Sequence, residues 1–177
     1  MSDLIVITYP DQEAGKKVFV ELDALQKQQL LTLEDAALAY KDTKGKVKVK
    51  QTLEKQYTGA ATVWGGFWGL LIGLLFLSPI FFGLVGALLG MILGRTADIG
   101  IDNKFIKEVG NSLEPGGSAV FMLVIKVTED KVIDDLQQFG GHVYQTSLSE
   151  EDEALLKKAL EHDQIKTAVD ETLDLES

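Results

Sequence analysis

The chain has 177 residues, no cysteine, and a formal net charge of −10 from 17 Lys and Arg against 27 Asp and Glu. The absence of thiols excludes disulfides, thiolate metal sites and a cysteine nucleophile. The acidic balance argues against a nucleic-acid-binding protein, which needs a basic face. The charge is unevenly spread, because residues 149–177 hold 10 acids and 3 lysines whereas residues 56–94 hold no charge at all.

The first part of the chain predicts strand, helix, strand and strand. We expect these elements over residues 4–9, 12–29, 32–40 and 46–50. The first run is apolar and rich in β-branched residues, which favours a buried strand. Apolar residues spaced three or four apart predict the helix, with Asp11 as its cap. Lysine and valine alternate strictly in the last run, which predicts a strand with one lysine face.

Beyond the uncharged run, helix, strand, helix, strand and helix follow. We expect them over residues 103–112, 118–127, 128–139, 142–146 and 149–162. Asp102 can cap the first helix and Thr128 the second. Ser149 with Asp152 resembles a capping box for the last helix, and the acidic residues beyond it predict a frayed or helical tail.

The order of elements predicts an α+β fold. Two βαβ units, residues 4–40 and 118–147, flank the uncharged run. Such units commonly pair into a four-stranded antiparallel sheet with helices on one face, the ferredoxin-like split βαβ arrangement. We therefore expect this sheet with an inserted hydrophobic helical hairpin. The corresponding regions are two halves of one cytoplasmic domain (1–55 and 95–162), the hairpin (56–94) and an acidic tail (163–177).

The uncharged run reads as two apolar limbs joined by a turn at Ser78 and Pro79. A helix needs about 20 residues to cross a bilayer. The first limb, extended back to Tyr57, has 21 residues and is long enough. The second limb, residues 80–94, has 15 residues, or roughly 22 Å of helix. The run therefore fits either a hairpin that spans the bilayer or a re-entrant hairpin that stops short of the far side. The alternative interpretation is a buried core hairpin of a soluble oligomer.

Six glycines are spaced four apart within the two limbs. The sets are Gly65, Gly69 and Gly73 in the first limb and Gly86, Gly90 and Gly94 in the second. On a helix each set lines one face, and bare glycine lets a second helix approach closely. The spacing therefore predicts close helix packing, either within one hairpin or between protomers of a homo-oligomer.

Basic residues stand on both sides of the run, which favours a hairpin with both ends on the cytoplasmic side of the inner membrane. Four lysines precede it on the expected strand and turn: Lys44, Lys46, Lys48 and Lys50. They could contact anionic lipid headgroups. Protection of a sheet edge against aggregation is an equal alternative, and pairing with the acidic tail is a third.

Several stretches together resemble one known family. They are residues 65–76, Pro79, the second glycine set, residues 98–102, 113–116 and 118–121, Gly140 with Gly141, and residues 145–148. The family is a bacterial and archaeal group of predicted membrane proteins catalogued as domain of unknown function 1269, and the resemblance covers roughly residues 4–160. It implies a membrane-associated glycine-zipper protein loosely linked with stress, and it supplies no reaction and no catalytic residue.

The remaining candidate residues have simpler interpretations. Asp98 and Asp102 could share a helix face and hold a cation. We prefer the simpler interpretation, in which Asp102 caps a helix and Asp98 lies where the chain leaves the membrane. His142 begins a strand and His162 lies near a helix end, without catalytic-triad spacing to a serine or an acid. No phosphate-binding glycine motif is present. We therefore expect no enzyme, no metal and no cofactor.

These features predict a non-enzymatic inner-membrane protein that self-assembles through its hairpins, in a structural or stress-related role, with lipid and further copies of itself as partners. An oligomeric pore is an alternative, although no intramembrane charge marks an ion pathway. A soluble self-assembling scaffold and a small-ligand-binding module are further alternatives, the last on fold analogy alone.

Overall fold

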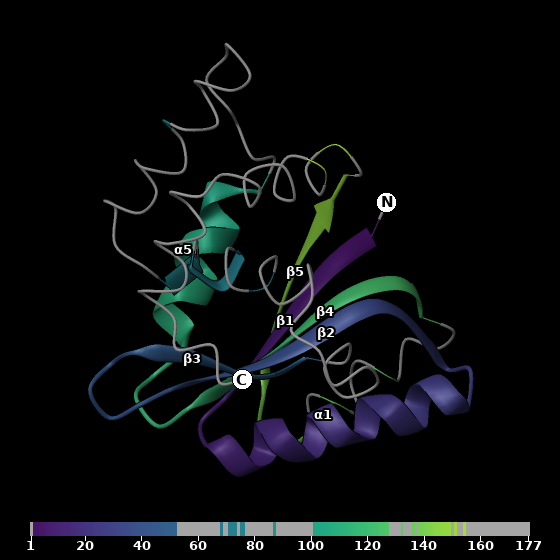
Figure 1. Cartoon of the computed structure of the whole chain (residues 1–177), viewed down its shortest axis with the longest axis horizontal. Coiled ribbons are helices and arrows are strands. Elements are labelled where there is room, and N and C mark those ends of the chain that lie inside the picture. Colours follow the sequence, from purple (N-terminus) through teal and green to yellow (C-terminus); the bar gives the residue numbers. More distant parts are fainter. Residues whose placement is uncertain are drawn as a thin grey trace.

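The computed structural model describes residues 2–52, 101–127 and 138–149, with the single positions 68, 71–73, 75, 76, 87, 132, 136, 151 and 154. Five strands form one antiparallel sheet in the order β3-β2-β4-β1-β5 (Figure 1). Their bounds are β1 Ser2–Tyr9, β2 Leu31–Lys41, β3 Val47–Thr52, β4 Ser118–Val127 and β5 His142–Leu148. The α+β antiparallel sheet is thus confirmed.

The sheet has one strand more than the four expected. β3, the lysine–valine segment, pairs with the outer edge of β2, with Ala39 opposite Val49 and Lys41 opposite Val47. Both valines are buried, so the predicted alternation is confirmed, but the strand begins only at Val47. The turn at Asp42 therefore contains Lys44 and Lys46, which do not belong to one strand face as expected.

The two halves of the chain are interleaved within this sheet. β4, from the second half, lies between β2 and β1, both from the first half. Seven paired positions join β4 to β1, and Ile5 lies opposite Met122 in this register. Neither half can therefore complete the sheet without the other.

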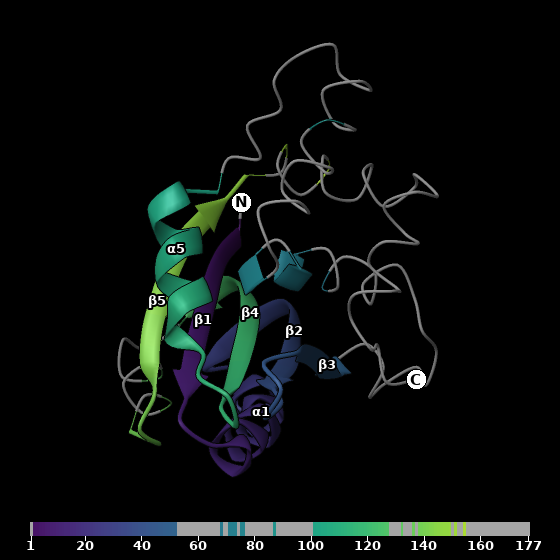
Figure 2. The ribbon, with the colours of Figure 1, turned by 90° about the vertical axis from the view of Figure 1, so that its left-hand side faces the viewer.

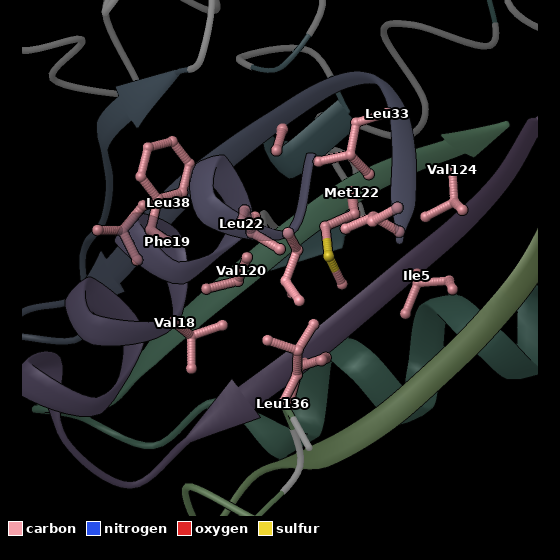
Figure 3. Close-up of a cluster of buried hydrophobic side chains, with 14 of the residues drawn as sticks. Ile5, Val18, Phe19, Leu22, Leu33, Leu38, Val120, Met122, Val124 and Leu136 are labelled. Atoms are coloured by element: carbon pink, nitrogen blue, oxygen red, sulfur yellow. The ribbon is translucent and has the colours of Figure 1, made fainter. Parts of the chain in front are cut away.

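One face of the sheet is covered by α1 (Gln12–Lys27). Asp11 caps this helix, since its Oδ1 accepts a hydrogen bond of 2.8 Å from the backbone N–H of Ala14. Apolar residues of α1 then pack onto alternate residues of the strands, together with Val132 and Leu136 from the β4–β5 connection. Figure 3 shows Val18, Phe19, Leu22, Leu136 and the sheet residues around Met122 gathered in this cluster.

The second face of the sheet is also covered, contrary to the expectation of helices on one face only. α5 (Asn103–Ser112) lies against β5 and β1 on this side (Figure 2). Its start at Asp102 and both its bounds agree with the prediction, and Phe105 and Val109 are its buried residues. By strand alternation, the buried side chains of the second face are Leu4, Val6, Ala37, Ala39, Val47, Val49, Ala119, Phe121 and Leu123.

Tyr9, at the end of β1, links the sheet to the β4–β5 connection by a hydrogen bond. Its hydroxyl donates a buried hydrogen bond of 2.9 Å to the carbonyl oxygen of Leu136. Burial raises the pKa of Tyr9 well above its ordinary value of 10.0. The folded protein therefore holds this proton more tightly than the unfolded chain does, and the associated stability is complete below pH 10 and lost as the pH rises above it.

We accordingly expect the free energy of unfolding to fall more steeply above about pH 10 in the wild type than in Tyr9→Phe, which has no phenolic proton. Urea unfolding at a series of pH values from neutral to pH 11 measures the difference. Other groups titrate alike in both proteins and cancel in the comparison. Parallel stability curves across this range would contradict the assignment.

Candidate functional site

Part of the uncharged run packs onto the second face of the sheet. Its helical positions Trp68, Leu71, Ile72 and Leu75 are buried, and we call these four residues the docked stripe. Their spacing of three, one and three residues is that of one face of an α-helix. Burying each of these side chains contributes about 1.5–3 kcal/mol relative to exposure in water. The docked stripe is therefore a substantial part of the second hydrophobic layer.

Aromatic rings fix the place of the docked stripe on the sheet. The ring centroids of Trp68 and Phe121 lie 6.1 Å apart with the planes tilted by 55°. Phe76 meets the same Phe121 ring edge to face, again at 6.1 Å. Both arrangements fall in the range in which aromatic pairs attract beyond simple area burial. Since Phe121 lies on β4, the stripe covers the middle of the sheet.

A polar contact lies inside this apolar layer. The indole Nε1 of Trp68 donates a hydrogen bond of 2.6 Å to Oδ2 of Asp35. The exposed fraction is 0% for Trp68 and 3% for Asp35. A buried carboxylate is tolerated only when hydrogen-bond donors meet it, and the tryptophan of the limb is one such donor.

A bulge in β2 directs Asp35 to this face. The register with β4 shifts between Leu33, opposite Val124, and Asp35, opposite Leu123. The register thus passes over one extra residue of β2, Glu34, which reverses the alternation that follows it. Leu33 consequently packs in the α1 layer, whereas Asp35 lies beside Leu123 in the second layer.

The limb also approaches α5 closely. A Cβ atom added at Gly110 would lie 2.6 Å from the backbone carbonyl oxygen of Leu75. No real Cβ contact is this short, so the glycine permits the two helical segments to touch. Gly110 is outside both glycine sets of the uncharged run, and its spacing gave no sign of this role.

We therefore expect Gly110→Ala to lower the free energy of unfolding by about 1–3 kcal/mol, the usual cost of overpacking. In a free helix the same substitution is stabilising by nearly 1 kcal/mol, so the sign of the change reports the contact. Lys107→Ala, at an exposed position of α5, is the matched control and should change stability by less than about 0.5 kcal/mol. A stabilised Gly110→Ala protein would refute the contact.

The predicted glycine packing lies largely outside the described residues. Gly73 is helical and buried. The other five zipper glycines (Gly65, Gly69, Gly86, Gly90 and Gly94) and the turn residues Ser78 and Pro79 fall outside the described ranges. Close packing by glycine within the hairpin therefore stays a prediction.

The lysine segment forms an exposed turn followed by an edge strand. Lys44 and Lys46 are exposed, Lys48 is half-buried in β3, and Lys50 lies in the same strand. Oδ1 of Asp42 accepts hydrogen bonds of 2.9 Å from the backbone N–H groups of Lys44 and Lys46. The bond from Lys46 is the main reason that the pKa of Asp42 lies below its ordinary value. The exposed amines remain at a sheet edge, where headgroup contact and edge protection are both open.

The acids and histidines form no catalytic arrangement in the described ranges. Asp102 caps α5, as expected, by accepting a hydrogen bond of 2.7 Å from the backbone N–H of Lys104. His142 is exposed at the start of β5, and Asp98 and His162 fall outside the described residues. Among the residues described, no three His, Asp or Glu side chains gather as a metal site would require.

A shallow groove of about 290 Å³ lies between α5 and β5. It is lined by Asp102, Lys104, Phe105, Glu108, Val143, Tyr144, Gln145 and Thr146. Its charged groups already have partners on α5, since Asp102 caps the helix and Lys104 Nζ lies 3.7 Å from Glu108 Oε1. Ligand pockets are usually enclosed and largely apolar, so this groove does not favour a ligand-binding module.

Sequence reasoning missed Asp35 and the docking role of Trp68. The available signal was two adjacent acids, Glu34 and Asp35, inside a largely apolar strand. A buried acid there needs a donor, and the indoles of the uncharged run were the candidates. Within the described ranges, no helix has both the length and the apolar character needed to cross a membrane.

Comparison with known proteins places the chain in one family. The sequence model of a family described as "Protein of unknown function (DUF1269)" matches residues 62–161, more than half of the chain. The match begins inside the uncharged run and ends beyond β5, so it is shorter than the resemblance over residues 4–160 suggested. No curated protein and no solved structure matches the chain. Because this match covers more than half of the sequence, the chain belongs to the DUF1269 family.

Proposed function

We propose that this DUF1269 protein is a non-enzymatic, membrane-associated protein that self-assembles through its glycine zippers. Its role is structural or stress-related organisation at the inner membrane, with both hairpin ends on the cytoplasmic side. One observation carries the proposal: a 39-residue run without charge, residues 56–94, connects two halves of a single sheet.

The interleaved sheet supports the hairpin topology. β3 ends at Thr52 and α5 begins at Asn103, and both elements belong to one folded domain. A single membrane crossing between them would place the two halves on opposite sides of the bilayer. A hairpin or a re-entrant loop returns the chain to the same side, as the pairing of β4 with β1 and β2 requires.

The finer fold in this proposal is a ferredoxin-like sheet with the hairpin as its insert. Without β3, the strand order is β2-β4-β1-β5, in which each βαβ unit has a strand of the other unit between its own two strands. This interleaving supports the split βαβ arrangement. The presence of Val132 and Leu136 in the α1 layer adds support, because both crossovers then cover one face.

Glycine packing and docking on the sheet use different sides of the first limb. At 100° per residue, the periodicity places Gly65, Gly69 and Gly73 about 110° around the helix from the centre of the docked stripe. The stripe can therefore contact the sheet while the glycines meet another helix. Exposed Lys44 and Lys46 at the β3 edge are the proposed contacts to anionic headgroups.

The joint substitution Gly69→Leu with Gly90→Leu tests self-assembly. Because a bulky side chain prevents the close backbone approach that a glycine zipper needs, we expect the cross-linked oligomers of the wild type to be lost or reduced in size. Val85→Leu enlarges a residue that helical periodicity, at 100° per residue, places about 140° from the centre of the Gly86, Gly90 and Gly94 set, and it should leave the oligomers intact. An unchanged pattern in the double variant would refute assembly through the zippers.

A soluble self-assembling scaffold is the second candidate, and burial of the docked stripe favours it. Apolar side chains that pack on the domain's own sheet need no lipid to shield them from water. In this case the remaining apolar residues of the run would be covered by other copies. Large particles that form without detergent distinguish this function from the first.

A further inference from the structure

The docked stripe can be shielded from water in two ways, by the sheet or by a lipid bilayer. Trp68, Leu71, Ile72 and Leu75 are buried against the sheet and α5, and they lie within the 39-residue uncharged run. The same side chains cannot pack on Phe121 and lie in a bilayer at the same time. Docking and membrane insertion of the first limb therefore exclude each other.

Apolar burial of the limb itself does not decide between the two environments. In water the docked stripe stays on the sheet because release would expose four large apolar side chains. Lipid tails are about as apolar as leucine, so a bilayer removes that penalty for the limb. The docked state is then held by the cover that the limb gives to Phe121 and its apolar neighbours on the sheet, by the ring contacts and by the hydrogen bond to Asp35.

The Asp35–Trp68 hydrogen bond has the properties of a latch. It joins the limb to the sheet over 2.6 Å, and it lies inside an apolar layer. A buried acid that accepts a hydrogen bond fixes the position of its donor, and the best-attested use of such buried polar groups is to select one arrangement over another. The indole N–H is also suited to the alternative state, since tryptophan finds partners at a membrane interface.

We propose that the first limb transfers between the sheet and a bilayer, and that the Asp35–Trp68 hydrogen bond sets the balance by holding the docked state. The proposal rests on the membrane association proposed above and specifies how the domain controls it. Release of Trp68 frees the stripe for lipid, and the hydrogen bond must break first. Weakening the latch therefore shifts the limb toward the membrane.

The test follows Trp68 in the full chain carrying Trp64→Phe, which leaves Trp68 as the sole tryptophan. Vesicles of phosphatidylglycerol and phosphatidylcholine with brominated acyl chains quench only an indole that enters the bilayer. We expect shielded emission without vesicles and quenching when they are added. Asp35→Leu should reach half-quenching at about tenfold less lipid, the size of effect expected from losing one hydrogen bond.

Two further variants keep the result interpretable. Thr8→Val changes a buried polar residue of nearly the same shape on β1 and should quench like the parent. Asp35→Asn keeps the size of the side chain and should lie between the parent and Asp35→Leu, so it carries the test if the leucine variant does not fold. Urea unfolding confirms that each variant is folded before lipid is added.

Three outcomes would overturn the latch. Unquenched Trp68 in protein that floats with the vesicles would show that the limb stays in the core, and the proposed membrane association would stand without insertion of this limb. Equal lipid dependence of Thr8→Val and both Asp35 variants would show that the pair has only a structural role. Protein that does not float with the vesicles would overturn the proposed function together with the latch.

Discussion

Phe121→Ala should lower the free energy of unfolding by about 3–5 kcal/mol, the range measured for large aromatic side chains removed from a core. Phe121 is fully buried on the strand that joins the two halves of the sheet. Its ring contacts both Trp68 and Phe76. Alanine would therefore leave a cavity and would remove the ring that these two aromatic side chains of the limb pack against. Urea unfolding of the full chain measures the loss.

Met122→Ala is the matched control for this substitution. Met122 is the neighbouring residue of the same strand, is equally buried, and faces the α1 layer. It should cost about 2–5 kcal/mol yet leave the emission of Trp68 unchanged in a Trp64→Phe background. Phe121→Ala should shift that emission to longer wavelength. The same emission in both variants would contradict the placement of the limb on β4.

Trp68→Ala should destabilise the protein by a similar amount, about 3–5 kcal/mol. The change removes a fully buried side chain and also a donor to the buried Asp35 carboxylate. Trp68→Phe separates the two effects, since it keeps an aromatic ring and removes the N–H. We expect Trp68→Phe to lower the free energy of unfolding by about 1–3 kcal/mol, the usual cost when a buried polar group loses a hydrogen bond.

A double-mutant cycle with Asp35→Leu isolates the hydrogen bond. The double variant Trp68→Phe with Asp35→Leu should lose less free energy of unfolding than the sum of the losses in the two single variants. The reason is that either substitution alone already breaks the hydrogen bond. Phe139→Ala, at a ring that is 39% exposed, should cost less than about 1 kcal/mol. Strict additivity at positions 35 and 68 would exclude direct coupling between them.

The elements that could be predicted from sequence are those with local signals. The bounds of α5 and β4 agree with the expectation because a capping aspartate precedes the helix and the turn at Gly116, with its φ of +85°, precedes the strand. The caps of α1 and α5 at Asp11 and Asp102 are also confirmed. These signals act over a few residues and need no knowledge of distant partners.

The contacts that escaped prediction depend on distant residues. Asp35 reaches the second layer through a bulge that only the pairing with β4 defines, and Trp68 is 33 positions away in the chain. The docked stripe has helical spacing, but every residue around it in the run is uncharged, so no polar face marks which side is covered by protein. Apolar character alone fits both a sheet and a bilayer.

We propose that the uncharged run makes this protein a self-assembling membrane protein. Alkaline carbonate extraction of isolated membranes, followed by sizing in a mild detergent, is the most direct test. We expect the chain to stay in the membrane pellet and then to run as a discrete oligomer in detergent. Release of the chain by carbonate as a discrete large particle without detergent would contradict membrane insertion and would favour the scaffold.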